Sequence, residues 1–281
     1  MDKINNILIK SKEYLKKNNI PSSTLDSELL LSSVINKTRE YLIINSKEEI
    51  SEDDSKKFYN LVERRKKQEP IAYILKKKDF WKSTFYINKN VLIPRPDTEI
   101  LIEETLSNFS KNENITVLDI GTGSGCIILS LLKDRKNFNG IGIDISKNAL
   151  KVAKFNAKMH HLENRVKFFK SSVDNFFKGK YDLVISNPPY INKVDFDNLD
   201  RGVSKYEPVI ALKGGNDGLS LIKKVIKRSS KLLKKSGKLI LEIGYDQKFK
   251  VKNLLKNEKF YINKTINDYG YKSRCIVCTK I

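Results

Sequence analysis

The sequence predicts an α/β protein whose mainly parallel sheet carries helices on both faces and ends in an antiparallel C-terminal hairpin. From residue 115 onward, short apolar segments alternate with longer amphipathic ones, which is typical of parallel strands joined by helices. We expect strands at 115 to 119, 140 to 144, 165 to 169, 181 to 186 and 237 to 243. We expect helices near 125 to 133, 147 to 159, 217 to 235 and 246 to 256. Two further strands, at 259 to 265 and 271 to 279, are expected to form the antiparallel pair.

The N-terminal segment, residues 1 to 75, predicts a small helical bundle. Apolar residues such as Ile4 and Ile7 recur at the three- and four-residue spacing of an amphipathic helix. Ser51, followed by acidic residues through Asp54, is a typical helix N-cap. Nothing in this segment resembles a catalytic cluster, so we expect it to recognise a partner or to cover a cleft.

The segment 76 to 96 predicts a β-hairpin linker, because aromatic pairs flank a short polar turn. Arg95 follows the hairpin between two prolines that stiffen the chain. Either an ordinary linker ion pair or a contact with the substrate in a ligand crevice would explain it. Asp97 or Thr98 is expected to cap the helix that opens the third domain, residues 97 to 281.

Bulk composition restricts the class of protein. The chain has 54 Lys and Arg residues against 33 Asp and Glu, a formal net charge of +21. Because the lysines are spread along the chain, a solvated basic surface and an acidic or RNA-carrying partner both stay open. No run approaches the ~20 apolar residues of a membrane span, so we expect a cytoplasmic protein without a membrane partner. Three cysteines are too few for a disulfide framework, and no metal site is expected.

Four residues, Asn187, Pro188, Pro189 and Tyr190, directly follow the apolar strand predicted at 181 to 186. They are therefore expected at the C-terminal end of a strand, where open α/β sheets bind ligands. The prolines remove two N–H donors and fix the backbone, but their carbonyls can still accept hydrogen bonds. Asn adds an amide, and Tyr adds a flat face with a hydroxyl. The set suits a planar group that carries an NH2, either an amide or the exocyclic amine of a base.

A glycine-rich turn follows the first predicted strand. It runs through Asp119, Gly121, Thr122, Gly123, Ser124 and Gly125 before a helix begins. Glycines between a strand and a helix let the backbone approach a ligand, and this spacing disfavours a nicotinamide cofactor and a P-loop nucleotide. The second strand ends in Asp144, whose carboxylate is placed to accept both hydroxyls of a ribose. A small adenine-containing cofactor is implied.

With these motifs in this order, the chain resembles the class I S-adenosylmethionine-dependent methyltransferases, and in particular the release factor glutamine N5-methyltransferases of the HemK family. The resemblance covers nearly the whole chain. It includes Glu69-Pro70-Ile71-Ala72-Tyr73, Ile93-Pro94-Arg95-Pro96-Asp97-Thr98-Glu99, Ser186-Asn187-Pro188-Pro189-Tyr190-Ile191, Glu207-Pro208, Gly214-Gly215-Asn216-Asp217-Gly218 and Leu241-Glu242-Ile243-Gly244. Many relatives carry an acidic residue and an apolar one after the third strand, whereas this chain has Ser171-Ser172-Val173-Asp174.

The resemblance implies a Rossmann-like methyltransferase domain that binds S-adenosylmethionine. By this likeness the cofactor contacts are Asp119, the turn from Gly121 to Gly125, Asp144, Ser172 and Asn187, with Asp174 able to supply the displaced acid. Arg95 and the four residues from Asn187 to Tyr190 are the substrate contacts. The implied substrate is the glutamine of the Gly-Gly-Gln motif in peptide chain release factors 1 and 2. We expect a monomer that forms no stable nucleic-acid complex.

The expected mechanism orients a poorly nucleophilic amide. The side-chain oxygen of Asn187 and the carbonyl of Pro188 are expected to accept its two N–H groups, while Tyr190 packs against the side chain. Asn187 and Pro188 are thus the candidate catalytic residues. Two alternatives share this chemistry: a nucleic-acid adenine N6-methyltransferase, with Tyr190 stacked on a flipped base, and a ribosomal-protein glutamine methyltransferase.

Overall fold

Contacts within the chain divide the protein into two units. The computed structural model describes residues 2–281. One unit contains the residues up to Lys76 together with Asp200–Tyr206, and the other contains Lys77–Leu199 and Glu207–Ile281. The sequence did not predict that the short segment 200–206 would join the N-terminal helices. Its Tyr206 hydroxyl donates a hydrogen bond to the carbonyl of Lys67, 2.8 Å away.

The N-terminal unit is helical, as the sequence predicts. Its helices are α1 (Ile4–Lys17), α2 (Ser23–Ile35), α3 (Arg39–Ile44), α4 (Glu52–Lys66), α5 (Ile71–Leu75) and α10 (Arg201–Tyr206). The inward faces of α1 to α5 form one apolar core that includes the fully buried Ile7, Leu15 and Phe58. The predicted cap of α4 is confirmed, because the Ser51 hydroxyl accepts a hydrogen bond from the backbone N–H of Asp54.

A two-stranded hairpin opens the second unit. Strands β1 (Lys77–Phe80) and β2 (Ser83–Tyr86) pair antiparallel around a turn at Trp81, whose φ is 54°. The Trp81 indole N–H donates to the Asp134 carboxylate at 2.5 Å. Asn156 holds the far end of the hairpin, because its amide bonds the backbone N–H and carbonyl of Tyr86. The hairpin is thereby fixed to helix α8 (Lys147–Met159) of the second unit.

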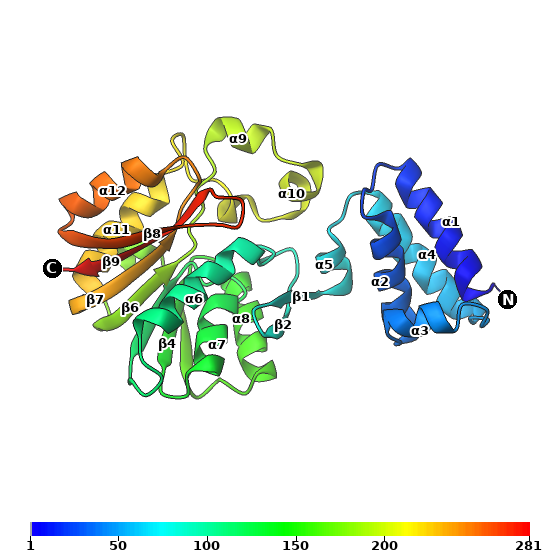
Figure 1. Cartoon of the computed structure of the whole chain (residues 1–281), viewed down its shortest axis with the longest axis horizontal. Helices are drawn as coiled ribbons and strands as arrows, with labels where there is room; N and C mark the ends of the chain where they lie inside the picture. Colours follow the sequence, from blue (N-terminus) through cyan, green and yellow to red (C-terminus); the bar gives the residue numbers. More distant parts are fainter. Residues whose placement is uncertain (1) are drawn as a thin grey trace. The chain divides into compact units, whose positions relative to one another are not determined.

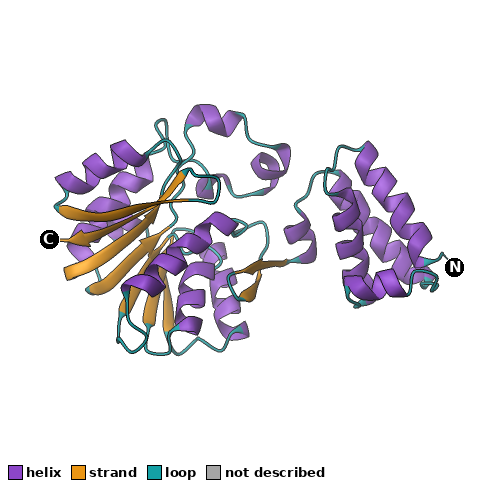
Figure 2. Cartoon of the chain, viewed as in Figure 1, coloured by secondary structure: helices purple, strands orange, loops and turns teal. Residues whose placement is uncertain are grey.

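A seven-stranded sheet forms the centre of the second unit (Figures 1 and 2). Its strands are β3 (Thr116–Ile120), β4 (Asn139–Asp144), β5 (Val166–Lys170), β6 (Tyr181–Ser186), β7 (Leu233–Glu242), β8 (Phe260–Asn267) and β9 (Ser273–Lys280). They lie in the order β5-β4-β3-β6-β7-β9-β8, and only β9 and β8 join antiparallel. The predicted mainly parallel sheet with an antiparallel C-terminal pair is confirmed.

Helices cover both faces of this sheet (Figure 1). On one face lie α6 (Glu99–Asn108), α7 (Cys126–Asp134) and α8 (Lys147–Met159); on the other lie α11 (Ser220–Leu232) and α12 (Lys248–Asn257). Neighbouring strand residues point to opposite faces, so Val117 joins the first core and Leu118 the second. Strands β3 and β6 are therefore buried over most of their length, as expected for parallel strands that are covered on both sides.

Two regions differ from the sequence-based expectation. Strand β7 begins at Leu233, where α11 was expected to continue to residue 235. The polar start of β7 hides the strand pattern, and Ser236 there has a φ of 62° next to an irregular pairing with β6. Between β6 and α11 the chain forms α9 (Lys193–Asp197), α10 and a turn of 3-10 helix at Val209–Ala211, none of which was predicted. Across residues 2–281, no helix is long and apolar enough to cross a membrane.

Truncation of a central side chain should test the core of the sheet. Leu183 of β6 is fully buried, so Leu183→Ala should lower the free energy of unfolding by about 3 kcal/mol through lost apolar contact and a cavity. Urea unfolding followed by the fluorescence of the single tryptophan, Trp81, reports on this unit. Val194→Ala is the matched control, because Val194 is 70% exposed and its loss should change stability by less than about 0.5 kcal/mol. Equal losses in the two variants would contradict the assigned core.

Candidate active site

The C-terminal ends of four parallel strands surround one cavity of about 260 Å³. Strands β3, β4, β5 and β6 end at this edge, and β3 lies between β4 and β6, where the strand order reverses. Open α/β sheets bind ligands at this position. The residues that follow each strand line the cavity, among them Gly121, Gly123, Asp144, Ser172 and Asn187.

The glycine turn leaves its backbone open to the cavity. Gly121 has a φ of 75°, and a Cβ added there would meet no protein atom within 4 Å. The space that a side chain would fill is therefore available to a ligand that approaches the main chain. Backbone N–H groups of Gly121 and Thr122 both donate to the carbonyl of Ile143, at 2.9 and 3.0 Å, and fix the turn to the end of β4.

Four further predicted cofactor residues belong to this turn or precede it, and all four are buried. Asp119 is fully buried and accepts a hydrogen bond from the Thr122 hydroxyl at 2.7 Å. Burial raises the pKa of Asp119 to about 7, although the Thr122 bond acts in the opposite direction. Thr122 and Ser124 are also buried, and Gly125 starts α7 with a φ of 80°. Direct cofactor contacts from these residues remain a prediction.

Asp144 connects the glycine turn to the next helix. Its Oδ2 accepts from the backbone N–H of Gly123 at 3.0 Å, and its Oδ1 accepts from that of Ser146 at 2.8 Å. Burial raises the pKa of this carboxyl above its ordinary value, and the two backbone bonds oppose the shift. Each carboxylate oxygen can accept a second hydrogen bond, so Asp144 is equipped to bind a diol in the cavity.

The loop after β5 closes another side of the cavity with Ser171, Ser172 and Val173. Asp174 also lines it, but its carboxylate pairs with Lys224 Nζ at 2.6 Å. The acidic group suggested for the adenine is therefore half of an ion pair at the cavity edge. Ser172 borders the cavity, as expected for a cofactor contact, and its role remains a prediction.

Asn187 and Pro189 line the same cavity as the glycine turn. Asn187 Nδ2 donates to Thr98 Oγ1 at 3.0 Å, and no described residue donates to Asn187 Oδ1. Pro188 is buried, and within residues 2–281 its carbonyl accepts no hydrogen bond. Two unused oxygen acceptors therefore occur in adjacent residues. Thr98 was expected to cap α6, but its side chain makes no cap bond and contacts Asn187 instead.

A glycine loop braces the tetrapeptide from behind. A Cβ on Gly214 would lie 2.8 Å from the Pro189 carbonyl oxygen and equally close to the Tyr190 Cα, so only glycine allows this approach. Gln247 Nε2 donates to the Tyr190 carbonyl at 3.0 Å. The Gly214 N–H donates to the carbonyl of Ile191 at 2.8 Å. The backbone after Pro188 is thus held in one position.

Three predicted substrate residues, Pro188, Arg95 and Tyr190, are not among the residues that line the cavity. Tyr190 packs against the second core, and its hydroxyl donates to Glu242 Oε1 at 3.1 Å. The Arg95 guanidinium pairs with Glu207 Oε1 at 2.6 Å, while Glu207 Oε2 accepts from the backbone N–H of Ile93 at 3.0 Å. Glu207 thereby binds the linker at Ile93 and Arg95. Leu92 of the linker and Pro208, which follows Glu207, both line the cavity. Substrate contacts of Arg95 and Tyr190 remain predictions.

Sequence reasoning missed four supporting residues: Thr98, Glu207, Glu242 and Gln247. Glu207 and Glu242 belong to motifs of the family resemblance, but their buried partners were not evident from the pattern.

Within the described residues, no group of three or more His, Cys, Asp or Glu side chains is arranged to hold a metal ion. The open glycine backbone, the Asp144 carboxylate and the apolar wall fit a nucleoside with an extended polar arm, and S-adenosylmethionine has this chemistry.

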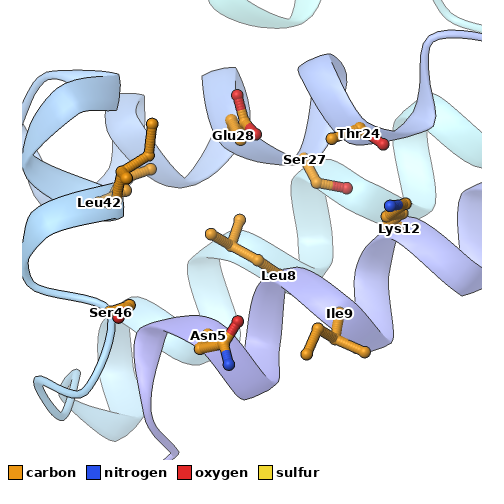
Figure 3. Close-up of a pocket in the computed structure, with 10 residues that line it drawn as sticks. Asn5, Leu8, Ile9, Lys12, Thr24, Ser27, Glu28, Leu42 and Ser46 are labelled. Atoms are coloured by element: carbon orange, nitrogen blue, oxygen red, sulfur yellow. The ribbon is translucent and has the colours of Figure 1, made fainter.

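A second cavity lies within the N-terminal unit (Figure 3). Leu8 and Lys12 of α1 lie on the side toward Glu28 of α2 and Leu42 of α3, and Ile9 of α1 also lines the cavity. Ile9 is 48% exposed, and Ile43 at the same cavity is 67% exposed. Polar residues also line it, among them Lys12, Ser27 and Glu28, and the Glu28 carboxylate is already paired with Arg39. This surface is suited to contact with another molecule more than to chemistry.

The glycine turn offers a direct test of the cofactor cavity. Gly121→Ala should weaken the binding of S-adenosylhomocysteine at least about tenfold, because the methyl group enters the open space and the positive φ becomes strained. Isothermal titration calorimetry measures this change. Gly179→Ala is the control, since Gly179 has a φ of 84° outside the cavity. Equal affinity in Gly121→Ala and the unchanged protein would exclude this turn from the cofactor site.

Comparisons with known proteins agree with this architecture. The model of the PrmC N-terminal domain matches residues 6–75, and a methyltransferase domain model matches residues 111–275. A solved methyltransferase from Pyrococcus furiosus shares the fold, with a TM-score of 0.53 and 18% identity over 70% of this chain and 88% of its own.

Curated relatives extend the similarity to the full length. The release factor glutamine methyltransferase of Clostridium acetobutylicum is 40% identical and covers 99% of each chain. That of Fusobacterium nucleatum is 39% identical over 98% of this chain and 78% of its own. With its helical N-terminal unit, its glycine turn and the Asn-Pro-Pro-Tyr segment in one chain, the protein belongs to the release factor glutamine methyltransferase family.

Proposed function

We propose that this protein transfers a methyl group from S-adenosylmethionine to the side-chain amide nitrogen of the glutamine in the Gly-Gly-Gln motif of peptide chain release factors 1 and 2, and thereby modulates translation termination. The amide nitrogen gains the methyl group and releases one proton to solvent, while the sulfonium becomes the neutral thioether of S-adenosylhomocysteine. Family membership supports this reaction, and the relatives are named for it.

One observation carries the proposal. Two unused oxygen acceptors, Asn187 Oδ1 and the Pro188 carbonyl, occur in adjacent residues next to the cavity that the glycine turn and Asp144 line. An NH2 group has two hydrogens to donate, so a primary amide matches this pair. A hydroxyl or a thiol has one hydrogen and would leave an acceptor unpaired.

The residues of the chain contribute position and charge. S-adenosylmethionine supplies the electrophilic methyl group when bound, and Gly121, Gly123 and Asp144 are the residues that would hold it. Asn187 and Pro188 accept the amide hydrogens and fix the direction of the nitrogen lone pair. Their oxygens also face the positive charge that develops on nitrogen during transfer, and fixed dipoles of this kind stabilise a transition state.

The N-terminal unit is the part that we propose recognises the release factor. Its cavity between α1, α2 and α3 is lined by the exposed Ile9 and Ile43 and by Lys12, so it offers both apolar and charged contacts to a partner. Arg95 and Tyr190 complete the substrate site in this proposal. We further propose that the protein acts as a cytoplasmic monomer and forms no stable complex with nucleic acid.

Substrate choice is the first test. With labelled S-adenosylmethionine, the protein should label a peptide release factor, should not label the same factor after its Gly-Gly-Gln glutamine is changed to alanine, and should not label duplex DNA or ribosomal proteins. Scintillation counting of each substrate gives the rates. Label on DNA would favour a nucleic-acid adenine methyltransferase. Label on ribosomal protein alone would favour a ribosomal-protein glutamine methyltransferase. Either result would overturn the proposal.

Asn187 is the second test. Asn187→Ala should lower kcat for the release factor about 10²-fold, because one preorganised acceptor is lost, while the affinity for S-adenosylhomocysteine changes much less. Single-turnover rates and calorimetry measure the two quantities. Asn198→Ala, at an exposed loop position outside the cavity, is the control that should keep the full rate. An unchanged kcat in Asn187→Ala would remove this residue from the mechanism.

A further inference from the structure

The first and last residues of the Asn-Pro-Pro-Tyr segment lead to the same buried carboxyl group. Tyr190 Oη donates to Glu242 Oε1 at 3.1 Å, and Asn187 Nδ2 donates to Thr98 Oγ1 at 3.0 Å. Glu242 ends strand β7, is 1% exposed, and has a second oxygen, Oε2, without a hydrogen-bond partner among the described residues. A buried carboxylate oxygen that accepts no hydrogen bond lowers the stability of the fold. A hydroxyl next to it is therefore favoured to donate its hydrogen to that oxygen.

Thr98 carries a hydroxyl next to Glu242. A threonine hydroxyl has one hydrogen to donate and lone pairs with which to accept. Its oxygen already accepts from Asn187, so its hydrogen remains to be placed. The Thr98 hydroxyl lies close enough to Glu242 to lower the pKa of that carboxyl by hydrogen bonding. The hydroxyls of Tyr190 and Thr98 can therefore both donate a hydrogen bond to the Glu242 carboxylate.

We propose that Glu242 is the positioning residue that fixes the direction of the Asn187 amide. Glu242 takes the Thr98 hydrogen, so the Thr98 oxygen can only accept, and the NH2 end of Asn187 must face Thr98. The oxygen of Asn187 is then the end that faces the cavity. This inference rests on the proposed function, because the amide substrate is the group that needs an acceptor there.

The alternative arrangement shows why the direction matters. If the Thr98 hydrogen turned toward Asn187 instead, the Asn187 amide would rotate to offer its oxygen to Thr98. Its NH2 group would then face the cavity and would meet the NH2 of a glutamine substrate donor to donor. The substrate would lose one of its two acceptors, although the cavity would keep its shape and its cofactor contacts.

Charged and titratable groups surround Glu242 on several sides. Tyr190 follows β6, Arg274 and Cys275 lie on β9, and Asp97 precedes α6. Arg274 donates to the Tyr190 hydroxyl at 3.3 Å, and its own charge is shared with Asp268 at 2.9 Å. Burial raises the pKa of Glu242 to about 7, against the opposing effects of Thr98, Tyr190 and Arg274. Above that pH the carboxylate only accepts, whereas below it the protonated carboxyl can also donate to Thr98.

Thr98→Val is the direct test, because it keeps the shape of the side chain and removes the hydroxyl. We expect kcat for the release factor to fall at least tenfold, with unchanged affinity for S-adenosylhomocysteine, and Thr98→Ser to recover most of the loss. Thr105→Val is the matched control: Thr105 is buried in helix α6, which follows Thr98, and its hydroxyl donates to the carbonyl of Leu101. If Thr98→Val keeps the kcat of Thr105→Val, the proposal is wrong.

The pH profile tests Glu242 itself. In the unchanged protein, kcat should fall as the pH drops through about 7, because the protonated carboxyl no longer dictates the direction of the Thr98 hydrogen. Glu242→Gln removes the titrating group, so this step should disappear and kcat should be low at every pH. A profile of Glu242→Gln with the same step and the same plateau would contradict the proposal.

A structural readout separates this inference from the proposed function. In the full chain labelled with 15N-asparagine, the Asn187 side-chain NH2 signals, assigned with Asn187→Asp, should show one proton protected by the bond to Thr98. Both Thr98→Val and Glu242→Gln should remove that protection. If the unchanged protein labels no release factor, the proposed function fails, and this measurement still decides the inference. Protection that persists in both variants would overturn it.

Discussion

The parallel pairing of β3 with β6 is the constraint on which the site depends. These strands align Val117 with Leu183 and Asp119 with Ile185, so both end at the same edge of the sheet. The glycine turn leaves β3 there, and Asn187 follows the end of β6. Two motifs about 60 residues apart in sequence thus border one cavity because side chains of both cores hold the strands in this register. The chemistry of the cavity follows from what the chain places after each strand.

Each of the two motifs is backed by a buried carboxyl at a strand end. Asp119 holds the glycine turn through Thr122, and Glu242 holds the tetrapeptide through Tyr190. Burial raises the pKa of both groups to about 7. Because the folded protein binds these protons more tightly than the unfolded chain does, both groups reduce stability as the pH rises from their ordinary pKa through about 7. Both carboxyl groups accept hydrogen bonds from residues of the two motifs, Asp119 from Thr122 and Glu242 from Tyr190, and so hold the motifs in position.

Much of the fold and the motif residues of the site could be predicted from sequence. Strands β3 to β6 are apolar and lie between helical segments, so their periodicity identifies them to within about two residues. The start of β7 and the short helices α9 and α10 could not be recognised, because they are polar and brief. Strand ends also predict that the glycine turn, Asp144 and Asn187 converge, since parallel strands end at one edge.

The supporting residues could not be predicted for a different reason. Thr98 and Asn187 are 89 positions apart, and Arg95 and Glu207 are 112 apart, so no local pattern signals their contacts. Glu242 and Gln247 lie at or near the end of an apolar strand, where sequence alone does not reveal which buried partner they meet. Partners of buried polar groups depend on the packing of the whole unit. The role expected for Thr98 as a helix cap illustrates this. Its hydroxyl oxygen accepts a hydrogen bond from Asn187, which follows strand β6, and makes no cap bond.

The account depends on a pair of oxygen acceptors that hold a primary amide beside the cofactor cavity. A crystal structure of the protein with S-adenosylhomocysteine and a release-factor domain that carries the Gly-Gly-Gln loop tests this most directly. The account predicts that the glutamine amide nitrogen lies within hydrogen-bond distance of Asn187 Oδ1 and the Pro188 carbonyl oxygen and points at the sulfur. A glutamine bound elsewhere, or an Asn187 side chain that presents its NH2 group to the substrate, would contradict it.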